Sequence, residues 1–407
     1  MRPAWVLFRS NSPQNGSRPG DVALCCPGVS RARTALCGLV LAWAFAGHAA
    51  EPAGKWRVAF FHDEKDSSFS IQDLRFSSPR SGMALGTLVR KGRARPSALV
   101  TNDGGKNWHF VSLKEEGLSL FLLNEGHGWM VGGDGVWKTT DGGESFQRLS
   151  KLRGLVRLHF LDEQRGFAVG APKKIWRTTD GGKHWDKVDA ADQPQSNPER
   201  SIYTWIDFPT PQLGFITGWH EPERYENLAR FPPWMDPKRA QRMRLLPSLT
   251  LNLQTTDGGK TWQSSSSSIF GKITRLRLLP GLTGLALVEY GANFEFPSEV
   301  YRVDVRKHET KSAFRTKDRA VTDFVILPGG QVVLAAIEPP GTVRELPLPG
   351  KLHMLHSSAG GWTEMPVDYR AEGQRAVMSL APGGSVWAAT DMGMILEWNG
   401  VRSPEQE

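Results

Sequence analysis

The chain has 407 residues, with 50 Lys and Arg against 42 Asp and Glu, and hydrophobic residues make up 39% of it. Such a composition allows a buried core and excludes global disorder. The 43 Gly and 27 Pro residues favour a turn-rich fold and argue against a coiled coil or a multi-pass membrane protein.

Residues 1–50 have the character of a secretory signal. Arg31 and Arg33 precede an apolar run at 35–46, which is followed by the small residues of 47–50. This order of basic, apolar and small residues is typical of exported proteins, and the run is too short to span a bilayer. We therefore expect a periplasmic or extracellular protein with no integral membrane span in its mature part, residues 51–407. All three cysteines lie within the first fifty residues, so the mature part needs no disulfide and offers no thiolate.

One octapeptide occurs four times and organises the chain. Its pattern is Thr-x-Asp-Gly-Gly-x-x-Trp or Phe, and we call each copy an Asp turn. The aspartate should bond the backbone of its own turn, the glycines supply positive φ angles, and the aromatic residue returns to a packing layer. We interpret these residues as structural, because a chain does not need four copies of one catalytic acid. The aspartates and aromatics are Asp103, Asp141, Asp180 and Asp257, with Trp108, Phe146, Trp185 and Trp262.

A second pattern, Gly-x-x-x-Gly, precedes each Asp turn and starts at Gly82, Gly128, Gly166 and Gly214. Each unit then reads as four strands, and three weaker units follow up to Trp398. Seven such units predict an all-β fold, a single seven-bladed β-propeller of four-stranded antiparallel blades. The seventh unit has only three strands of its own, so we expect the N-terminal strand 55–61 to complete it.

The four octapeptides resemble the repeats of Asp-box (BNR) propellers. The units of blades 2 and 3, with Gly-[FW]-x-x-Gly followed by Trp-[KR]-Thr-Thr-Asp-Gly-Gly, resemble those of photosystem II assembly-factor propellers and their relatives in non-photosynthetic bacteria. The resemblance is specific over 71–262 and faint over 263–407. It implies a seven-bladed propeller and a secreted scaffold, but it does not imply contact with a photosystem, because the bacterial relatives are broader. Sialidases, sortilin-type receptors and some glucanases share the repeat.

The innermost strand of each blade predicts the lining of a central channel. Apolar residues alternate with mostly polar ones, and the two sets must point to opposite faces. The polar set should face the channel, either as a solvated network of ion pairs or as a binding mouth rich in Arg. Its members are Asp73, Arg75, Arg157, His159, Trp205, Asp207, Arg275, Arg277 and Asp323.

Two connections between the second and third strands of a blade carry basic residues. Blade 1 has Arg90, Lys91, Arg93 and Arg95, and blade 4 has an insertion at 220–247. We expect both on the face opposite the Asp turns, where they form either a solubilising charge run or a docking face for acidic surfaces or anionic headgroups. The insertion residues assigned to this face are Arg230, Trp234, Arg239 and Arg242.

Two functions remain open from the sequence. The first is a non-catalytic exported scaffold, an assembly or accessory factor that binds a protein partner through the basic loop face and the channel mouth. The second is a sialidase-like glycoside hydrolase acting on an anionic or neutral glycan, with Tyr203, Glu289 or Tyr290 as the nearest nucleophile candidates. We expect a monomer without cofactor, metal or nucleic acid; His353 and His356 should point to opposite faces of one strand, which is unfavourable for a metal site.

Overall fold

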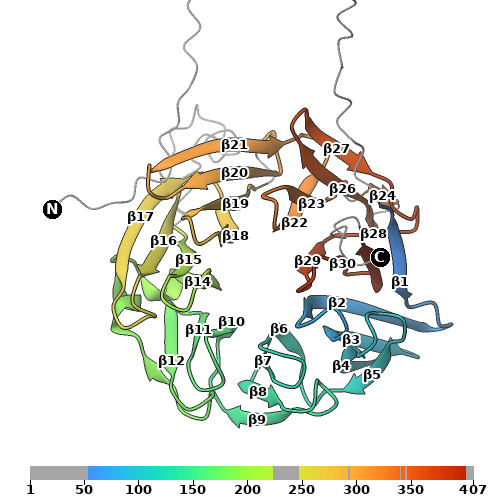
Figure 1. Ribbon diagram of the computed structural model, residues 1–407, viewed down its shortest axis with the longest axis horizontal. Helices are drawn as coiled ribbons and strands as arrows, with labels where there is room; N and C mark the ends of the chain where they lie inside the picture. Colours follow the sequence, from blue (N-terminus) through green and yellow to red (C-terminus); the bar gives the residue numbers. More distant parts are fainter. Residues whose placement is uncertain (1–53, 223–246, 292–293, 340, 344–345, 400–407) are drawn as a thin grey trace, which may run out of the picture.

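The computed structural model describes residues 54–222, 247–291, 294–339, 341–343 and 346–399. Its sheets stand around a central axis and form a closed ring (Figure 1). Seven blades follow one another in chain order, and within each blade the first strand lies nearest the axis. The predicted seven-bladed propeller is therefore confirmed.

Blades 1 to 4 are regular four-stranded antiparallel sheets. Their strands, from the axis outward, are β2 (Ser67–Phe76), β3 (Gly82–Arg90), β4 (Arg93–Thr101) and β5 (His109–Ser112) in blade 1; β6 (Gly117–Leu122), β7 (Gly128–Gly132), β8 (Val136–Thr139) and β9 (Gln147–Ser150) in blade 2; β10 (Leu155–Phe160), β11 (Gly166–Gly170), β12 (Lys174–Thr178) and β13 (Asp186–Lys187) in blade 3; and β14 (Ser201–Asp207), β15 (Gly214–His220), β16 (Ser248–Thr255) and β17 (Gln263–Ile269) in blade 4. Two 3-10 helices, η1 (Asp189–Asp192) and η2 (Pro198–Arg200), connect blades 3 and 4.

The later blades keep the plan with one elaboration. Blade 6 carries a small extra hairpin, β24–β25, and a short strand, β28, that pairs with β26. The remaining strands are β18 (Lys272–Leu278), β19 (Thr283–Glu289), β20 (Ser298–Asp304) and β21 (Glu309–Arg315) in blade 5; β22 (Ala320–Ile326), β23 (Val332–Ile337), β24 (Gly341–Val343), β25 (Leu346–Leu348), β26 (Gly350–Ser358), β27 (Gly361–Met365) and β28 (Glu372–Gly373) in blade 6; and β29 (Ala376–Leu380), β30 (Val386–Thr390) and β31 (Met394–Trp398) in blade 7.

The ring is closed by the N-terminal strand, as predicted. β1 (Trp56–Phe61) pairs antiparallel with β31 and forms the outer strand of blade 7. The rings of Trp56 and Trp398 stack at 6.4 Å, and Arg57 forms an ion pair with the buried Glu397. Because the last blade takes strands from both ends of the described chain, this pairing fastens the first blade to the last and closes the ring.

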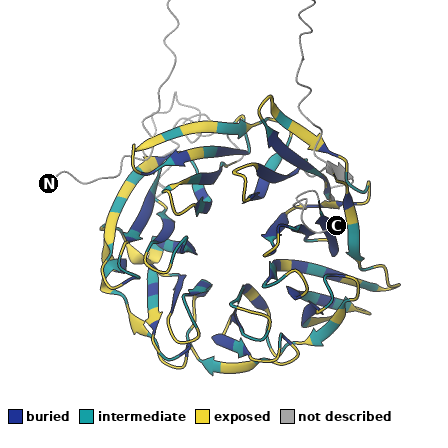
Figure 2. Ribbon diagram, viewed as in Figure 1, coloured by how far each residue is buried: buried dark blue, intermediate teal, exposed yellow. Residues whose placement is uncertain are grey.

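Each inner strand except that of blade 7 contains the same irregularity. The pairing of the first and second strands shifts by one residue, for example between Ile71 and Asp73 in blade 1 and between Val321 and Asp323 in blade 6. Such a shift is a β-bulge, which bends a strand and redirects a side chain. The residue after the bulge is the deeper of the two channel-facing positions on each strand. Figure 2 shows that burial concentrates on the inner strands, whereas the outer strands carry the exposed residues.

The four Asp turns share one hydrogen-bond pattern, seen here in blade 2. The Thr139 hydroxyl donates to Asp141 at 2.7 Å and accepts from the Gly143 amide at 2.8 Å. Asp141 also accepts from the amide of Ser145 at 3.0 Å and from its hydroxyl at 2.6 Å. In the other three turns the residue equivalent to Ser145 again bonds the aspartate through its side chain: Asn107, His184 and Thr261. The aspartates are therefore structural, as the sequence indicated.

The two glycines of each Asp turn have different roles. The first donates its amide to the turn between the first two strands of its own blade, as Gly142 does to Gly126 at 3.0 Å. The second lies against a side chain of the preceding blade. A Cβ on Gly105 would lie 2.4 Å from the ring of Trp387, and one on Gly259 would lie 2.1 Å from that of Phe167. Both glycines also have positive φ angles, so no other residue fits either position well.

The aromatic residue that ends an Asp turn wedges between two blades. Trp108 meets the ring of Phe76 edge-on at 6.1 Å, and Phe76 stacks on Trp387 of blade 7 at 4.0 Å. The same three-ring arrangement joins blades 2 and 3 and blades 3 and 4. We call each arrangement an aromatic wedge, and its other members are Trp185, Phe160 and Trp129, and Trp262, Phe208 and Phe167.

Replacement of Asp141 by Ala should lower the free energy of unfolding by about 1–2 kcal/mol, because three turn hydrogen bonds are lost. Burial opposes the shift, but bonds from Ser145 and Thr139 lower the pKa of Asp141 below its ordinary 3.8. Its stabilising effect is therefore present above pH 3.8 and is lost as the pH falls further. Urea unfolding of both proteins at pH 7 and pH 3 tests this, and an equal difference at the two pH values would contradict it.

Candidate functional site

A cavity of about 410 Å³ lies on the axis of the ring. Residues of all seven inner strands line it, together with Pro209, Leu279 and Pro280 from the turns that follow two of these strands. In an antiparallel blade the turns after the first and third strands emerge on the same face. The cavity therefore opens on the face of the Asp turns, whereas the turns after the second strands lie at the other end of the channel.

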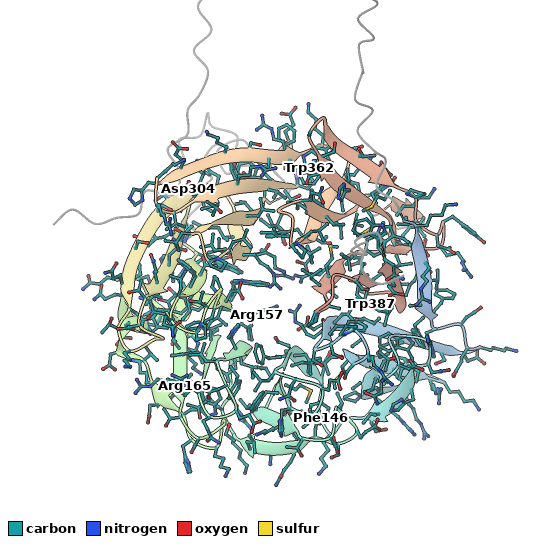
Figure 3. All side chains as sticks on the ribbon, viewed as in Figure 1. Phe146, Arg157, Arg165, Asp304, Trp362 and Trp387 are labelled. Atoms are coloured by element: carbon teal, nitrogen blue, oxygen red, sulfur yellow. The ribbon has the colours of Figure 1, made fainter. Side chains whose placement is uncertain are left out.

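The centre of the cavity is a group of arginines around one tryptophan. Arg157 lies 4.1 Å above the ring of Trp205, and Arg275 and Arg277 approach the same ring at 4.9 and 5.8 Å. Figure 3 shows Arg157 near the middle of the ring. Among the described residues, neither Arg157 nor Arg277 has a carboxylate within 4.0 Å, so an indole face is the partner of both cations.

Arg157 carries an unfavourable positive charge. Burial and the neighbouring Arg75 and Arg275 outweigh Asp73 and Asp323 and lower the pKa of Arg157 to about 9. The guanidinium is still charged at neutral pH, but its environment disfavours that charge. Binding of an anion at such a site is favourable, because the negative charge offsets both the burial of the guanidinium and its repulsion by the other arginines.

Two aspartates below the cavity join neighbouring blades instead of facing a ligand. Asp73 accepts from the amide of Leu120 in blade 2 at 2.9 Å and pairs with Arg75 at 3.1 Å. Asp323 accepts from the amide of Met378 in blade 7 at 2.9 Å, and it lies 3.4 Å from Arg275. Burial raises the pKa of Asp323, but Arg275 and the Met378 amide outweigh it, so the carboxyl is ionised.

The remaining titratable pair on the cavity wall is His159 and Asp207, whose closest atoms are 4.0 Å apart. Burial outweighs Asp207 and lowers the pKa of His159 to about 4, so the imidazole is neutral at pH 7. His159 also packs against Phe121 at 4.8 Å. This side of the cavity is therefore aromatic and nearly uncharged apart from Asp207.

The structure separates the nine predicted channel residues into two groups. Six line the cavity: Arg75, Arg157, His159, Trp205, Asp207 and Arg277. The other three, Asp73, Arg275 and Asp323, are buried below it and are occupied by bonds within the protein. Sequence alternation placed all nine on the channel side of their strands, but it did not separate the two groups. Arg157 and Trp205 follow the bulge just as Asp73, Arg275 and Asp323 do, yet they line the cavity.

The predicted basic loop of blade 1 is a tight hairpin. Lys91 and Gly92 alone form the turn, and their φ angles of 49° and 74° fit the two-residue turns that match strand twist. Arg93 and Arg95 are therefore exposed residues of β4, and Arg90 pairs with Glu64 at 2.7 Å. The hairpin lies at the end of the channel away from the cavity. The insertion residues Arg230, Trp234, Arg239 and Arg242 lie outside the described residues.

The hydrolase candidates do not meet in the cavity. The Tyr203 hydroxyl is fully buried and donates to the carbonyls of Ala191 and Gln193, so it fastens η1 to blade 4. Glu289 accepts from Thr274, and Tyr290 donates to Glu299. Asp207 is the one carboxylate among the described residues that line the cavity. The paired carboxyl groups that glycoside hydrolysis needs are not assembled there.

The described residues hold no cluster of three or more His, Cys, Asp or Glu side chains suited to a metal. His353 bonds Glu364 and Glu338, whereas His356 packs against Trp398 on the other face of β26. No helix in the described part of the chain has the length and apolar character needed to cross a bilayer.

Comparison with known proteins supports the fold. No family model and no curated protein matches the chain. Among solved structures, YCF48 bound to D1 peptide is similar with a TM-score of 0.53 and 16% identity over 83% of this chain and 98% of that one. YCF48 from Cyanidioschyzon merolae gives 0.53 and 15% over 84% and 98%. The propeller domain of the Trilobed protease from Pyrococcus furiosus gives 0.51 and 11% over 82% and 96%. At these identities the likeness establishes a shared propeller fold.

Replacement of Asp323 by Ala should lower the free energy of unfolding by about 3 kcal/mol, because it leaves Arg275 buried without its carboxylate and the Met378 amide without an acceptor. Asp207 is the matched control, since its contact with His159 is long and partly exposed. Asp207→Ala should cost less than about 1 kcal/mol. Urea unfolding measures both, and equal losses would show that Asp323 does not join the blades.

Proposed function

We propose that this chain is an exported, non-catalytic member of the Asp-box propellers that serves as a scaffold for a protein partner. The cavity on the channel axis receives a carboxylate of that partner, either its C-terminal carboxylate or an acidic side chain. The four Asp turns and the resemblance of blades 2 and 3 to assembly-factor propellers support the family assignment. The role that fits this resemblance is that of an assembly or accessory factor.

One observation carries the binding proposal: Arg157 is partly buried, charged and without a carboxylate partner among the described residues, and its guanidinium lies over the face of Trp205. Arg277 adds a second cation on the same wall that has no carboxylate partner in the described part of the chain. Arginines held on an aromatic face present their N–H groups in a fixed plane, which suits the two oxygens of a carboxylate. The structural neighbour YCF48 was solved bound to a D1 peptide, and peptide binding by that propeller supports the same kind of ligand here.

The blade 1 hairpin supplies a second contact at the other end of the channel. Arg93 and Arg95 are exposed, and no carboxylate among the described residues pairs with them. A positively charged end of this kind attracts acidic protein surfaces or anionic headgroups. The scaffold then holds a partner chain at the cavity while its other face contacts an acidic or membrane-proximal surface.

The binding proposal is tested with two synthetic octapeptide libraries, randomised at six positions and made once as C-terminal acids and once as carboxamides. Immobilised protein should retain acids over amides. The best acid, labelled with fluorescein, should bind Arg157→Gln about tenfold to a hundredfold more weakly by anisotropy, because a charge-assisted bond is lost.

Arg165→Gln is the control, since Arg165 is an exposed residue paired with Asp162 in the same blade. It should bind like the wild type. Arg157→Gln should not lower the melting temperature at pH 7: a base whose pKa falls on folding destabilises the native state while it is charged, so its removal costs little. Equal retention of both libraries, or binding unaffected by Arg157→Gln, would refute a carboxylate site.

Export is tested by expressing the full chain in a Gram-negative bacterial host. The mature protein should appear in the periplasmic fraction, with a new N-terminus near Ala50. Cleavage there leaves β1, which starts at Trp56, intact to close the ring. A variant with Leu39 and Leu41 changed to Arg should stay uncut in the cytoplasm, because the apolar run is interrupted. Cytoplasmic accumulation of the unaltered chain would contradict the export proposal.

A further inference from the structure

A second cavity, of about 350 Å³, lies between blades 5 and 6 and borders the channel cavity. Leu279 and Ile326 line both cavities. Leu285, Val303 and Val332 are almost fully buried beneath it, and Arg302, Asp304, Glu309 and Lys311 form a charged rim. Leu279, in contrast, is a large apolar side chain with 40% of its surface exposed. We call this second cavity the blade 5–6 groove.

The groove lies at one of the blade interfaces that lack an aromatic wedge. By strand register, Ile326 is equivalent to Phe76, and Leu285 is equivalent to Met83, one residue after the first glycine of the second strand. The third member of a wedge comes from the turn between the third and fourth strands. In blade 6 that turn is only Ser358–Gly361, and Trp362 beyond it packs on Phe314 and donates to Ala313 at the outer rim. Among the residues that the structure describes, no aromatic side chain of blade 6 therefore lines the groove.

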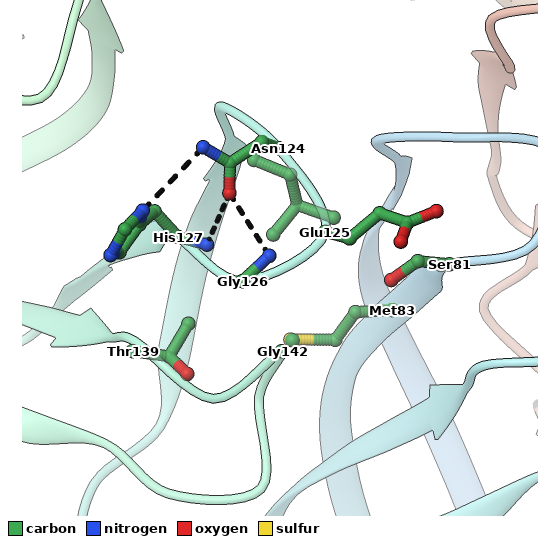
Figure 4. A pocket seen from close by; sticks show the side chains of 10 residues that line it. Ser81, Met83, Asn124, Glu125, Gly126, His127, Thr139 and Gly142 are labelled. Carbon is green, nitrogen blue, oxygen red and sulfur yellow. Dashed lines mark hydrogen bonds between the residues drawn. The ribbon is translucent and has the colours of Figure 1, made fainter.

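The interface between blades 1 and 2 shows how a gap closes without three aromatic rings. There Met83 and Leu122 fill the space beneath the turn of Asn124, which Figure 4 shows from close by. Asn124 holds that turn through bonds from the amides of Gly126 and His127, at 2.9 and 2.7 Å. Phe146 of the Asp turn packs on the same cluster. At the interface between blades 5 and 6, Phe314 and Trp362 pack on the corresponding cluster, but neither of them lines the groove.

We propose that the blade 5–6 groove binds a large apolar side chain, aromatic or aliphatic, of the same peptide whose carboxylate enters the channel cavity. This inference rests on the proposed function and adds a sequence preference to it. The peptide side chain takes the position that the wedge residue holds at other blade interfaces. The charged rim of the groove does not select an anion or a cation, because it has two positive residues, Arg302 and Lys311, and two negative ones, Asp304 and Glu309.

The shared wall sets where the apolar residue stands in the peptide. Leu279 and Ile326 separate the two cavities by a single row of side chains, so the carboxylate and the apolar residue must lie close in sequence. Extended peptides advance by about 3.3 Å per residue and alternate their side chains. We therefore expect one apolar position within a few residues of the C-terminus, while the other positions remain unselective.

The acid library described above tests this preference when the retained peptides are sequenced by mass spectrometry. Phe, Leu, Ile or Trp should be enriched at one position near the C-terminus. In a resynthesised peptide, changing that residue to Ser should weaken binding about tenfold by anisotropy, as expected for loss of a buried apolar side chain.

Two variants test whether the apolar residue of the peptide binds in the groove. Thr283 lines the groove but not the channel cavity, so Thr283→Trp should fill the groove and Thr283→Asp should make it polar. Both should reduce the tenfold advantage of the apolar peptide over its Ser counterpart to about twofold or less. Gln331→Trp is the control, because Gln331 holds the equivalent turn position in blade 6, where its carbonyl accepts from Leu327 as that of Thr283 does from Leu279. It should keep the full advantage.

The outcomes separate this inference from the function on which it rests. Retention of acids over amides without an enriched apolar position would overturn the groove and leave the carboxylate site standing. An enriched position that Thr283→Trp and Thr283→Asp leave unchanged, in variants that melt like the wild type, would also overturn it. Equal retention of acids and amides would instead remove the carboxylate site itself.

Discussion

The close approach of one blade to the next depends on glycines that carry no side chain. At the second glycine of three Asp turns, a Cβ would lie within 2.4 Å of a side chain from the preceding blade: Trp387 at Gly105, Met83 at Gly143 and Phe167 at Gly259. The hydrogen bonds of the aspartate hold the turn in the conformation that places this glycine against the preceding blade. The aromatic residue at the end of the turn then packs between the two blades. Because each turn contacts its neighbour, seven small sheets that are marginal alone become one cooperative ring.

Much of this arrangement could be predicted from the sequence, because the same motifs recur in several blades. Four copies of Thr-x-Asp-Gly-Gly, each preceded by Gly-x-x-x-Gly, predicted the blade period, the strand count and the role of β1. A further signal was present and overlooked: the seventh octapeptide position is always polar, as Asn107, Ser145, His184 or Thr261, because its side chain bonds the aspartate. Comparison of the four copies with one another would have shown it.

The residues that face the channel could be predicted from the sequence. Which of them line the cavity, and at which end of the channel the cavity opens, could not. Asp323 and Arg157 hold equivalent positions after the bulge of their strands, yet Asp323 bonds blade 7 whereas Arg157 lines the cavity. The partner of Arg157 is an indole from the neighbouring blade, and no local pattern encodes that contact. Nor did the basic residues of blade 1 reveal that their hairpin stands at the end of the channel away from the cavity, because net charge carries no information about where a cavity opens.

The ring is thus uneven in a way that bears on function. At the position that follows the bulge, blades 1 and 6 have aspartates that join neighbouring blades. At the same position blade 4 has Trp205, and blades 3 and 5 have Arg157 and Arg275, which both lie against its indole ring. The same half of the molecule loses the Asp turn after blade 4, and with it the wedge that would fill the gap between blades 5 and 6. Loss of a repeat normally costs packing. Here it leaves an apolar groove beside Arg157, which has no carboxylate partner among the described residues, and the proposed peptide binding rests on these two neighbouring surfaces.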